Sequence, residues 1–104
     1  MSLGERIAAQ RKQLGLTQKS LAESIQKSDG QAITPQYLND IEHDRRSPAS
    51  PELIEQLARA LELQPDILYY EVGVLPSDLT NRSVSNDRVV AAFQAFRDEL
   101  EDRG

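Results

Sequence analysis

Apolar residues recur along the first 73 positions of the chain with a spacing of about 3.6 residues, the spacing of amphipathic helices. Most of these segments open on a serine or threonine that can cap a helix, and several place proline at the first helical position. Two glycines, Gly15 and Gly73, stand where helices end. The pattern predicts helices over 3–13, 17–25, 34–42, 50–61 and 65–73.

The segment over 34–42 has the clearest helix start in the chain. Thr34 is the predicted N-cap, Pro35 occupies the first turn, and Ile33 and Leu38 have the spacing of a hydrophobic staple. The side of this helix opposite Leu38 is polar, and it carries Gln36, Asn39, Asp40 and His43. Amide side chains on an exposed helix face suit the edge of a base pair.

A polar linker over 74–86 separates these five segments from a sixth predicted helix within 87–104. Its apolar residues step by four, three and four positions, like the seam of a coiled coil: Val89, Phe93, Phe96 and Leu100. An isolated helix of about fifteen residues is marginal in water, so it must pack on something. The seam either folds back on the first domain or pairs with a partner subunit. We favour the partner, which makes 87–104 a candidate dimerisation element.

Composition supports one all-α domain over 1–73 with this appendage. The chain of 104 residues has five aromatic residues, no cysteine and one histidine, which argues against disulfides and multi-histidine metal sites. No apolar run approaches membrane length, and no secretory signal is apparent. We expect a soluble cytoplasmic protein without a metal or other cofactor. Because no nucleophile–base pair or phosphate loop is visible, we also expect no enzymatic activity.

The net charge of −5 opposes nonspecific binding to nucleic acid, but it is unevenly distributed. Residues 1–50 carry seven Lys/Arg and six Asp/Glu, whereas residues 51–104 carry five and eleven. The first half is therefore free to approach phosphates.

Two consecutive short helices, the second with a polar face, suggest binding to the major groove of DNA, which admits one α-helix. Gln36 and Asn39 are three positions apart and share a helix face, and amides of this kind can pair with adenine. Gln18 opens the helix before them, where helix N-termini favour phosphate. Arg45 and Arg46 follow the second helix and can grip the backbone from the loop. The simpler alternative is that these residues only face solvent.

Several motifs occur together along the first 61 residues. They are Leu14-Gly15-Leu16-Thr17-Gln18, Leu21-Ala22, Ile33-Thr34 through Ile41-Glu42, Arg45-Arg46-x-Pro48 and Leu57-Ala58-x-x-Leu61. In combination the chain resembles, over about residues 3–72, the lambda repressor/Cro-like (XRE) helix-turn-helix family. The resemblance implies a five-helix bundle that binds DNA through its second and third helices.

The resemblance also implies roles for individual residues. Gln18 would contact the DNA backbone and sometimes a base. The positions of the family's base-reading residues are held by Pro35, Gln36, Asn39 and Asp40. The family's buried arginine–glutamate pair matches Arg11 and Glu42, which would fix the angle of the reading helix.

The chain departs from the family pattern in two respects. The connection over 26–32 has about six more residues than the short turn of the motif. Either the preceding helix is longer, or a loop bulges out beside the DNA. In the second case Lys27 would reach a phosphate. Asp40 and Asp44 are acidic where phosphate is near, although Asp40 could accept a hydrogen bond from cytosine. The full candidate DNA-binding set is Gln18, Lys19, Lys27, Thr34, Pro35, Gln36, Tyr37, Asn39, Asp40, His43, Arg45 and Arg46.

We therefore predict a sequence-specific regulator of transcription that binds double-stranded DNA, acting as a repressor and as a homodimer on a pseudo-palindromic operator. One alternative is an antitoxin or a controller protein of a toxin–antitoxin, restriction or phage system. Another is a protein-interaction module that keeps the fold but has lost DNA binding, which the negative charge and the two aspartates favour.

Overall fold

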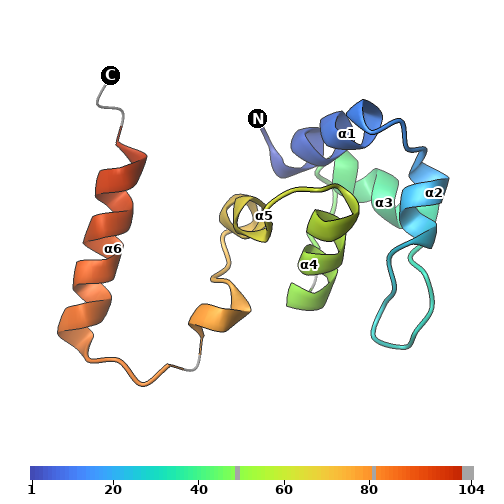
Figure 1. Ribbon diagram of the computed structural model, residues 1–104. Helices are drawn as coiled ribbons and strands as arrows, with labels where there is room; N and C mark the ends of the chain where they lie inside the picture. The colour runs from blue at the N-terminus through green and yellow to red at the C-terminus, as the bar shows by residue number, and fades with distance from the viewer. Residues whose placement is uncertain (49, 81, 102–104) are drawn as a thin grey trace.

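The computed structural model describes residues 1–48, 50–80 and 82–101, and within these ranges the chain is helical (Figure 1). The elements are α1 (Leu3–Gln13), α2 (Gln18–Glu23), α3 (Pro35–Glu42), α4 (Pro51–Ala60), α5 (Pro65–Val72), the short 3-10 helix η1 (Ser77–Leu79) and α6 (Asn86–Leu100). The only pairing of extended backbone in the described ranges is one isolated bridge between Gln26 and Ala32. The predicted all-α class is confirmed.

Local capping explains where the helices begin. The Ser2 side chain accepts a hydrogen bond from the Glu5 N–H in a capping box, and Thr17 forms a second capping box with Ser20. Thr34 and Ser50 each accept one N–H hydrogen bond as simple N-caps. α5 ends at Gly73, whose φ of 85° is accessible mainly to glycine. The prediction for the second helix was too long, because α2 ends at Glu23 and the chain then turns into an extended loop.

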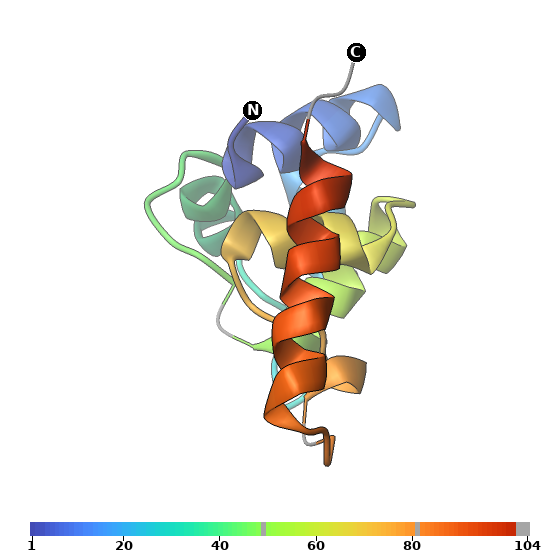
Figure 2. The same ribbon diagram turned by 90° about the vertical axis from the view of Figure 1, so that its left-hand side faces the viewer.

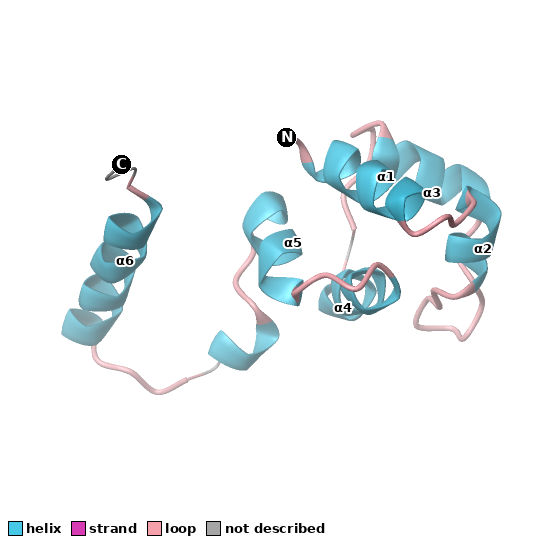
Figure 3. Ribbon diagram, turned by 45° about the horizontal axis from the view of Figure 1, so that its top comes forward, coloured by secondary structure: helices cyan, strands magenta, loops and turns pink. Residues whose placement is uncertain are grey.

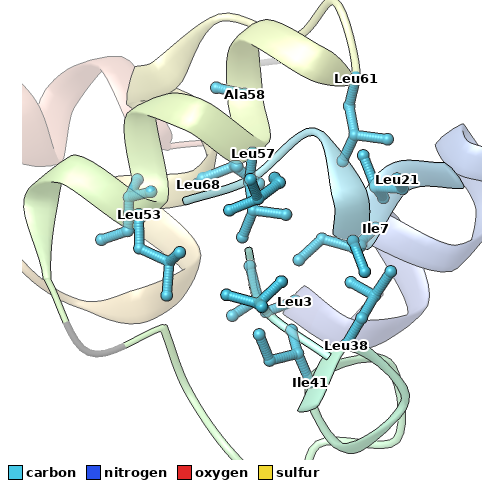
Figure 4. Close-up of a cluster of buried hydrophobic side chains, with 14 of the residues drawn as sticks. Leu3, Ile7, Leu21, Leu38, Ile41, Leu53, Leu57, Ala58, Leu61 and Leu68 are labelled. Atoms are coloured by element: carbon cyan, nitrogen blue, oxygen red, sulfur yellow. The ribbon is translucent and has the colours of Figure 1, made fainter. Parts of the chain in front are cut away.

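The apolar faces of the first five helices meet in one core (Figure 4). Side chains with no more than 1% exposure come from all five of these helices, among them Ile7, Leu21, Leu38, Ile41, Leu57, Ala58 and Leu68. α1 also crosses α3 very closely, since a Cβ at Gly4 would collide with the carbonyl groups of Ile41 and Glu42. The C-terminal end of α3 is thus pressed directly against the start of α1.

The connection between α2 and α3 projects from the bundle as a small hairpin (Figures 1 and 3). The Lys27 N–H donates to the Gln31 carbonyl at 2.8 Å, and the Ile33 N–H donates to the Ile25 carbonyl at 2.9 Å. Gly30 at the tip has a φ of 84°. Of the two alternatives for this segment, the structure therefore has the bulging loop. We call residues 25–33 the α2–α3 hairpin.

α6 stands apart from the bundle and passes in front of α5 in the view of Figure 2. None of its residues is buried. Its contact with α5 is an edge-to-face pair between Phe96 and Tyr70, with ring centroids 6.2 Å apart. The four seam residues lie on α6 with 42–55% of their surface exposed: Val89, Phe93, Phe96 and Leu100.

Candidate DNA-binding interface

α3 is held at a fixed angle by an ion pair with α1. The Arg11 Nε donates to Glu42 Oε2 at 2.7 Å, and a second guanidinium nitrogen lies 3.1 Å from Oε1. The two side chains are only 11% and 3% exposed. The same guanidinium donates to the Leu16 carbonyl at 2.8 Å, so it also fixes the turn before α2. Paired, hydrogen-bonded charges of this kind are costly to break, because the remaining partner would be buried and uncompensated.

Gln18, the first residue of α2, extends this pair toward the exposed face of α3. Its Nε2 donates to Glu42 Oε1 at 3.0 Å and to Asn39 Oδ1 at 3.1 Å. Four residues thus form one connected chain of polar contacts, which we call the anchor network: Arg11, Glu42, Gln18 and Asn39. Gln18 and Asn39 are half-buried, whereas Gln36 and His43 on the same ridge of α3 are exposed.

A second polar group lies on the outer side of α3. The Gln36 Nε2 and an Arg45 guanidinium nitrogen both donate to Asp40 Oδ1, each at 3.1 Å. Arg45 remains 60% exposed, so this pair is weakly stabilising and is able to rearrange. Asp40 is therefore partly neutralised by its neighbour, which reduces the repulsion it would exert on a phosphate.

The remaining candidates on and after α3 are held by local contacts. The Arg46 guanidinium lies over the Tyr37 ring, 5.0 Å from its centroid, in a cation–π contact. Thr34 uses its hydroxyl to cap the Tyr37 N–H at 3.0 Å, and Pro35 is exposed beside it. His43 ends the helix with its Nδ1 2.9 Å from the Asn39 carbonyl. All of these residues flank the first turn or the last turn of α3.

Asp44 has a structural partner that sequence reasoning did not find. Its carboxylate accepts the Ser2 hydroxyl at 2.7 Å and the Gly4 N–H at 2.9 Å, at the positive N-terminal end of α1. The Ser2 and Gly4 hydrogen bonds lower the pKa of Asp44 below its ordinary value of 3.8. Asp44 also has a φ of 59°, a conformation that aspartate tolerates better than most residues. Its charge is therefore directed toward α1.

The α2–α3 hairpin is fastened to α4 by Gln56, a residue not singled out from the sequence. Gln56 Oε1 accepts from the Gln26 N–H at 2.8 Å, and Gln56 Nε2 donates to the Gln26 carbonyl at 2.7 Å. Beside this clasp lies a groove of about 530 Å³, whose lining includes Lys27, Ser28 and Tyr37. Lys27 thus lines the same groove as Tyr37, a residue in the first turn of α3.

The structure brings the candidates together unevenly. Five of the candidates lie around α3 and are joined by the contacts given above: Gln18, Asn39, Gln36, Asp40 and Arg45. Lys19 is exposed on α2, and the four seam residues lie on α6, away from α3. Gln56 and Asp44 carry no signal in the sequence, because their partners are thirty and about forty positions away.

In the described residues, no group of three or more His, Cys, Asp or Glu side chains is arranged to hold a metal ion. Across the same ranges, no helix is both long and apolar enough to span a membrane.

Comparisons with known proteins agree with this architecture. A family model described as helix-turn-helix matches residues 7–68. The chain is 31% identical over 102 residues to the immunity repressor protein of Bacillus phage phi105; the match includes 97% of the chain and 66% of that repressor. Among solved structures, a chain of the SinR protein/SinI protein complex has a TM-score of 0.53 at 23% identity, covering 94% of this chain and 99% of that chain. The chain belongs to the XRE-type helix-turn-helix family of DNA-binding transcription regulators.

Proposed function

We propose that this protein is a sequence-specific transcriptional repressor that places α3 in the major groove of double-stranded DNA. The anchor network carries this proposal. In this network a buried ion pair positions Gln18, and Gln18 in turn hydrogen-bonds to Asn39 on the partly exposed face of α3. A helix that only packs against the core needs no such support for its outer face, whereas base reading requires side chains in a defined geometry.

The charge distribution supports contact with phosphates around α3. Asp44 is directed toward α1 and Asp40 is paired with Arg45, so two acidic side chains near the proposed interface are already compensated. Three further cations are exposed on or next to the two helices: Lys19 on α2, Lys27 in the α2–α3 hairpin and Arg46 after α3. In this proposal they hold the protein on the DNA backbone, while Gln36 and Asn39 distinguish base pairs.

Repression is proposed from the phage relative, whose name describes an immunity repressor. The chain spans 66% of the length of that protein, and the match extends through α6 as well as the first five helices. We propose the same direction of regulation here. A reporter gene whose promoter overlaps the bound site should fall in expression when the protein is present and recover when the site is changed.

We further propose that α6 pairs with α6 of a second copy. Its four exposed seam residues form an apolar stripe, and burial of such a stripe is what stabilises a helix of this length. A two-fold dimer would present two copies of α3 to successive turns of one DNA face, about 34 Å apart, and would select a pseudo-palindromic site.

Selection of bound duplexes from a random DNA pool tests the proposal. We expect a palindromic consensus with half-sites separated by about 10 base pairs, or a multiple of that number. Binding to the consensus should weaken steeply with salt, because each phosphate contact releases counterions. A protein-interaction module with the same fold would enrich no duplex even at low salt, and that result would refute DNA binding.

A further inference from the structure

Gln56 lies on α4, outside the set of residues proposed to touch DNA, and its side chain joins α4 to the α2–α3 hairpin. We infer that Gln56 is a positioning residue for DNA binding: by holding the hairpin, it places Lys27 on the phosphate backbone at the edge of the major groove. This role rests on the proposed function, because it assumes that α3 enters the major groove.

Hydrogen bonds fix the backbone of Lys27 and of the residue before it. The Lys27 N–H donates to the Gln31 carbonyl at 2.8 Å, and the Lys27 carbonyl accepts from the Gly30 N–H at 2.9 Å. The preceding residue, Gln26, uses both its N–H and its carbonyl on the Gln56 side chain, at 2.8 and 2.7 Å. The Gln56 amide therefore pairs with Gln26 as the backbone of a neighbouring strand would, and it ties the hairpin to α4.

The ordered part of the hairpin contributes little to the hydrophobic core. Ile25 and Ile33, at its two ends, are buried, whereas residues 26–32 are all exposed. That stretch is polar except for Gly30 and Ala32, so it has no large apolar side chain of the kind that anchors protein interfaces. Holding exposed residues in one conformation costs entropy. A fixed polar loop of this kind suits a charged partner better than the apolar surface of another protein.

Lys27 is the cation of this loop, and its charge is available to a partner. The side chain is exposed and forms no ion pair with any residue that the structure describes. Asp29, the acidic residue of the loop, turns back and accepts the Gln31 N–H at 2.9 Å. The Lys27 ammonium can therefore meet an anion outside the chain.

The place of the hairpin beside α3 indicates which anion this is. Lys27 and Ser28 line the same surface groove of about 530 Å³ as Tyr37, in the first turn of α3. An α-helix with its side chains is about 10–12 Å across, and the major groove of DNA is about 12 Å wide. Because α3 would fill the major groove, an element beside its first turn meets the backbone that borders the groove. We expect Lys27 on a phosphate there.

Salt dependence distinguishes a positioning role from a purely structural one. Gln56 is uncharged, so its replacement can change the slope of log affinity against log salt only through a charged side chain. In Gln56→Ala we expect this slope, for the selected duplex, to become shallower by about 0.5. The affinity at about 0.15 M salt should fall about threefold. Gln56→Met, which keeps the volume of the side chain, should give the same result.

Gln10→Ala is the matched control. Gln10 also donates from its side-chain amide to a backbone carbonyl of another segment, that of Leu61 at 2.9 Å, but it does not contact the hairpin. This variant loses a hydrogen bond of the same kind and should keep the wild-type slope.

A Lys27→Ala background shows whether Gln56 acts through Lys27. Lys27→Ala alone should weaken binding about fivefold at about 0.15 M salt, the loss expected for one phosphate contact. Adding Gln56→Ala should then change neither the affinity nor the slope further. Fully additive losses, an unchanged slope in either Gln56 variant, or an equal change of slope in Gln10→Ala would show that Gln56 does not position Lys27.

The wild-type protein separates the failure of this role from the failure of the proposed function. If it enriches a consensus duplex while the slopes or the additivity contradict the role of Gln56, that role is wrong and sequence-specific binding stands. If it enriches no duplex, both are wrong.

Discussion

At the residue scale, Glu42 connects the bundle to the proposed DNA-reading surface. This carboxylate joins α1, α2 and α3, because it accepts from Arg11 and Gln18 while lying near the end of α3. It is 3% exposed, so each of these contacts is made away from bulk water. The same residue therefore contributes to the stability of the bundle and to the orientation of the proposed reading surface.

Replacing Glu42 with alanine should lower the free energy of unfolding by about 3–5 kcal/mol, because Arg11 would be left buried and unpaired. Urea denaturation followed by circular dichroism measures this change. The matched control is Glu71→Ala, which removes the ion pair between Arg6 and Glu71, where the side chains are 34% and 17% exposed. That change should cost about 1 kcal/mol or less. Equal losses in the two variants would show that the Arg11–Glu42 pair has no special role.

We predict that Asp44 makes the free energy of unfolding depend on pH. Hydrogen bonds from Ser2 and Gly4 lower its pKa in the folded state below 3.8. A carboxyl group of this kind contributes stability that is fully present above its unfolded pKa and is lost as the pH falls through the lower, folded value. The contribution should therefore be complete at neutral pH, begin to fall near about pH 4 and be lost as the pH drops through the lower pKa of the folded state.

The Asp44→Asn variant should accordingly be less stable than the wild type at neutral pH, and the difference should shrink as the pH falls below about 4. Asparagine is a suitable replacement because it also tolerates the positive φ at this position. Thermal unfolding of both proteins across a pH series makes the measurement. Parallel stability curves would mean that the Ser2 and Gly4 contacts contribute nothing to the folded state.

At the scale of elements, the helices could be predicted from the sequence, whereas the loop that forms the α2–α3 hairpin could be expected only as one of two alternatives. Thr34 with Pro35, and Ser50 with Pro51, are local signals that act within one turn of their helix. Gln56 joins the hairpin to α4 from thirty positions away, and no local pattern specifies that pairing. For the same reason, the candidate surface of α3 was visible as a polar face, whereas the hydrogen bonds that orient it required the tertiary structure.

A Gln56→Ala variant should release the hairpin while the core stays folded. The change removes two hydrogen bonds to the Gln26 backbone, which together contribute about 1–3 kcal/mol. Hydrogen exchange should accelerate at the amides of Lys27 and Ile33, which close the hairpin, and remain unchanged at core amides such as that of Leu57. Unchanged exchange at Lys27 would show that the hairpin holds its shape without the two hydrogen bonds between Gln56 and Gln26.

Removing the charge of Lys27 should weaken binding to all duplexes alike, since a phosphate contact carries no sequence information. The slope of log affinity against log salt should become shallower by about 0.9. Arg88→Ala makes the same change of charge on α6, far from the hairpin (Figure 1), and should leave the slope nearly unchanged. Equal effects from Lys27→Ala and Arg88→Ala would place Lys27 outside the interface.

At the scale of the whole molecule, the chain consists of a packed five-helix bundle and a sixth helix without buried residues. The core residues belong to the first five helices and the loops between them, so α6 is not needed to complete that core. Its exposed apolar residues are the basis of the proposed pairing with another copy.

Replacing Phe93 and Phe96 together with glutamate should convert a dimer into a folded monomer, because two charges would be buried in the proposed seam. Sedimentation equilibrium reports the mass, and the helical signal of the bundle reports folding. A chain shortened to residues 1–80 should behave in the same way. A dimer that survives both changes would place the interface elsewhere.

We propose that α3 reads base sequence through Gln36 and Asn39. The most direct measurement is the ratio of affinities for the selected duplex and for a scrambled duplex of equal length, in the wild type and in the Gln36→Ala/Asn39→Ala double variant. We predict a ratio of about 10³ or more for the wild type. In the variant the ratio should fall close to one, with affinity for the scrambled duplex preserved. Equal loss of affinity for both duplexes, or a wild-type ratio near one, would contradict the claim.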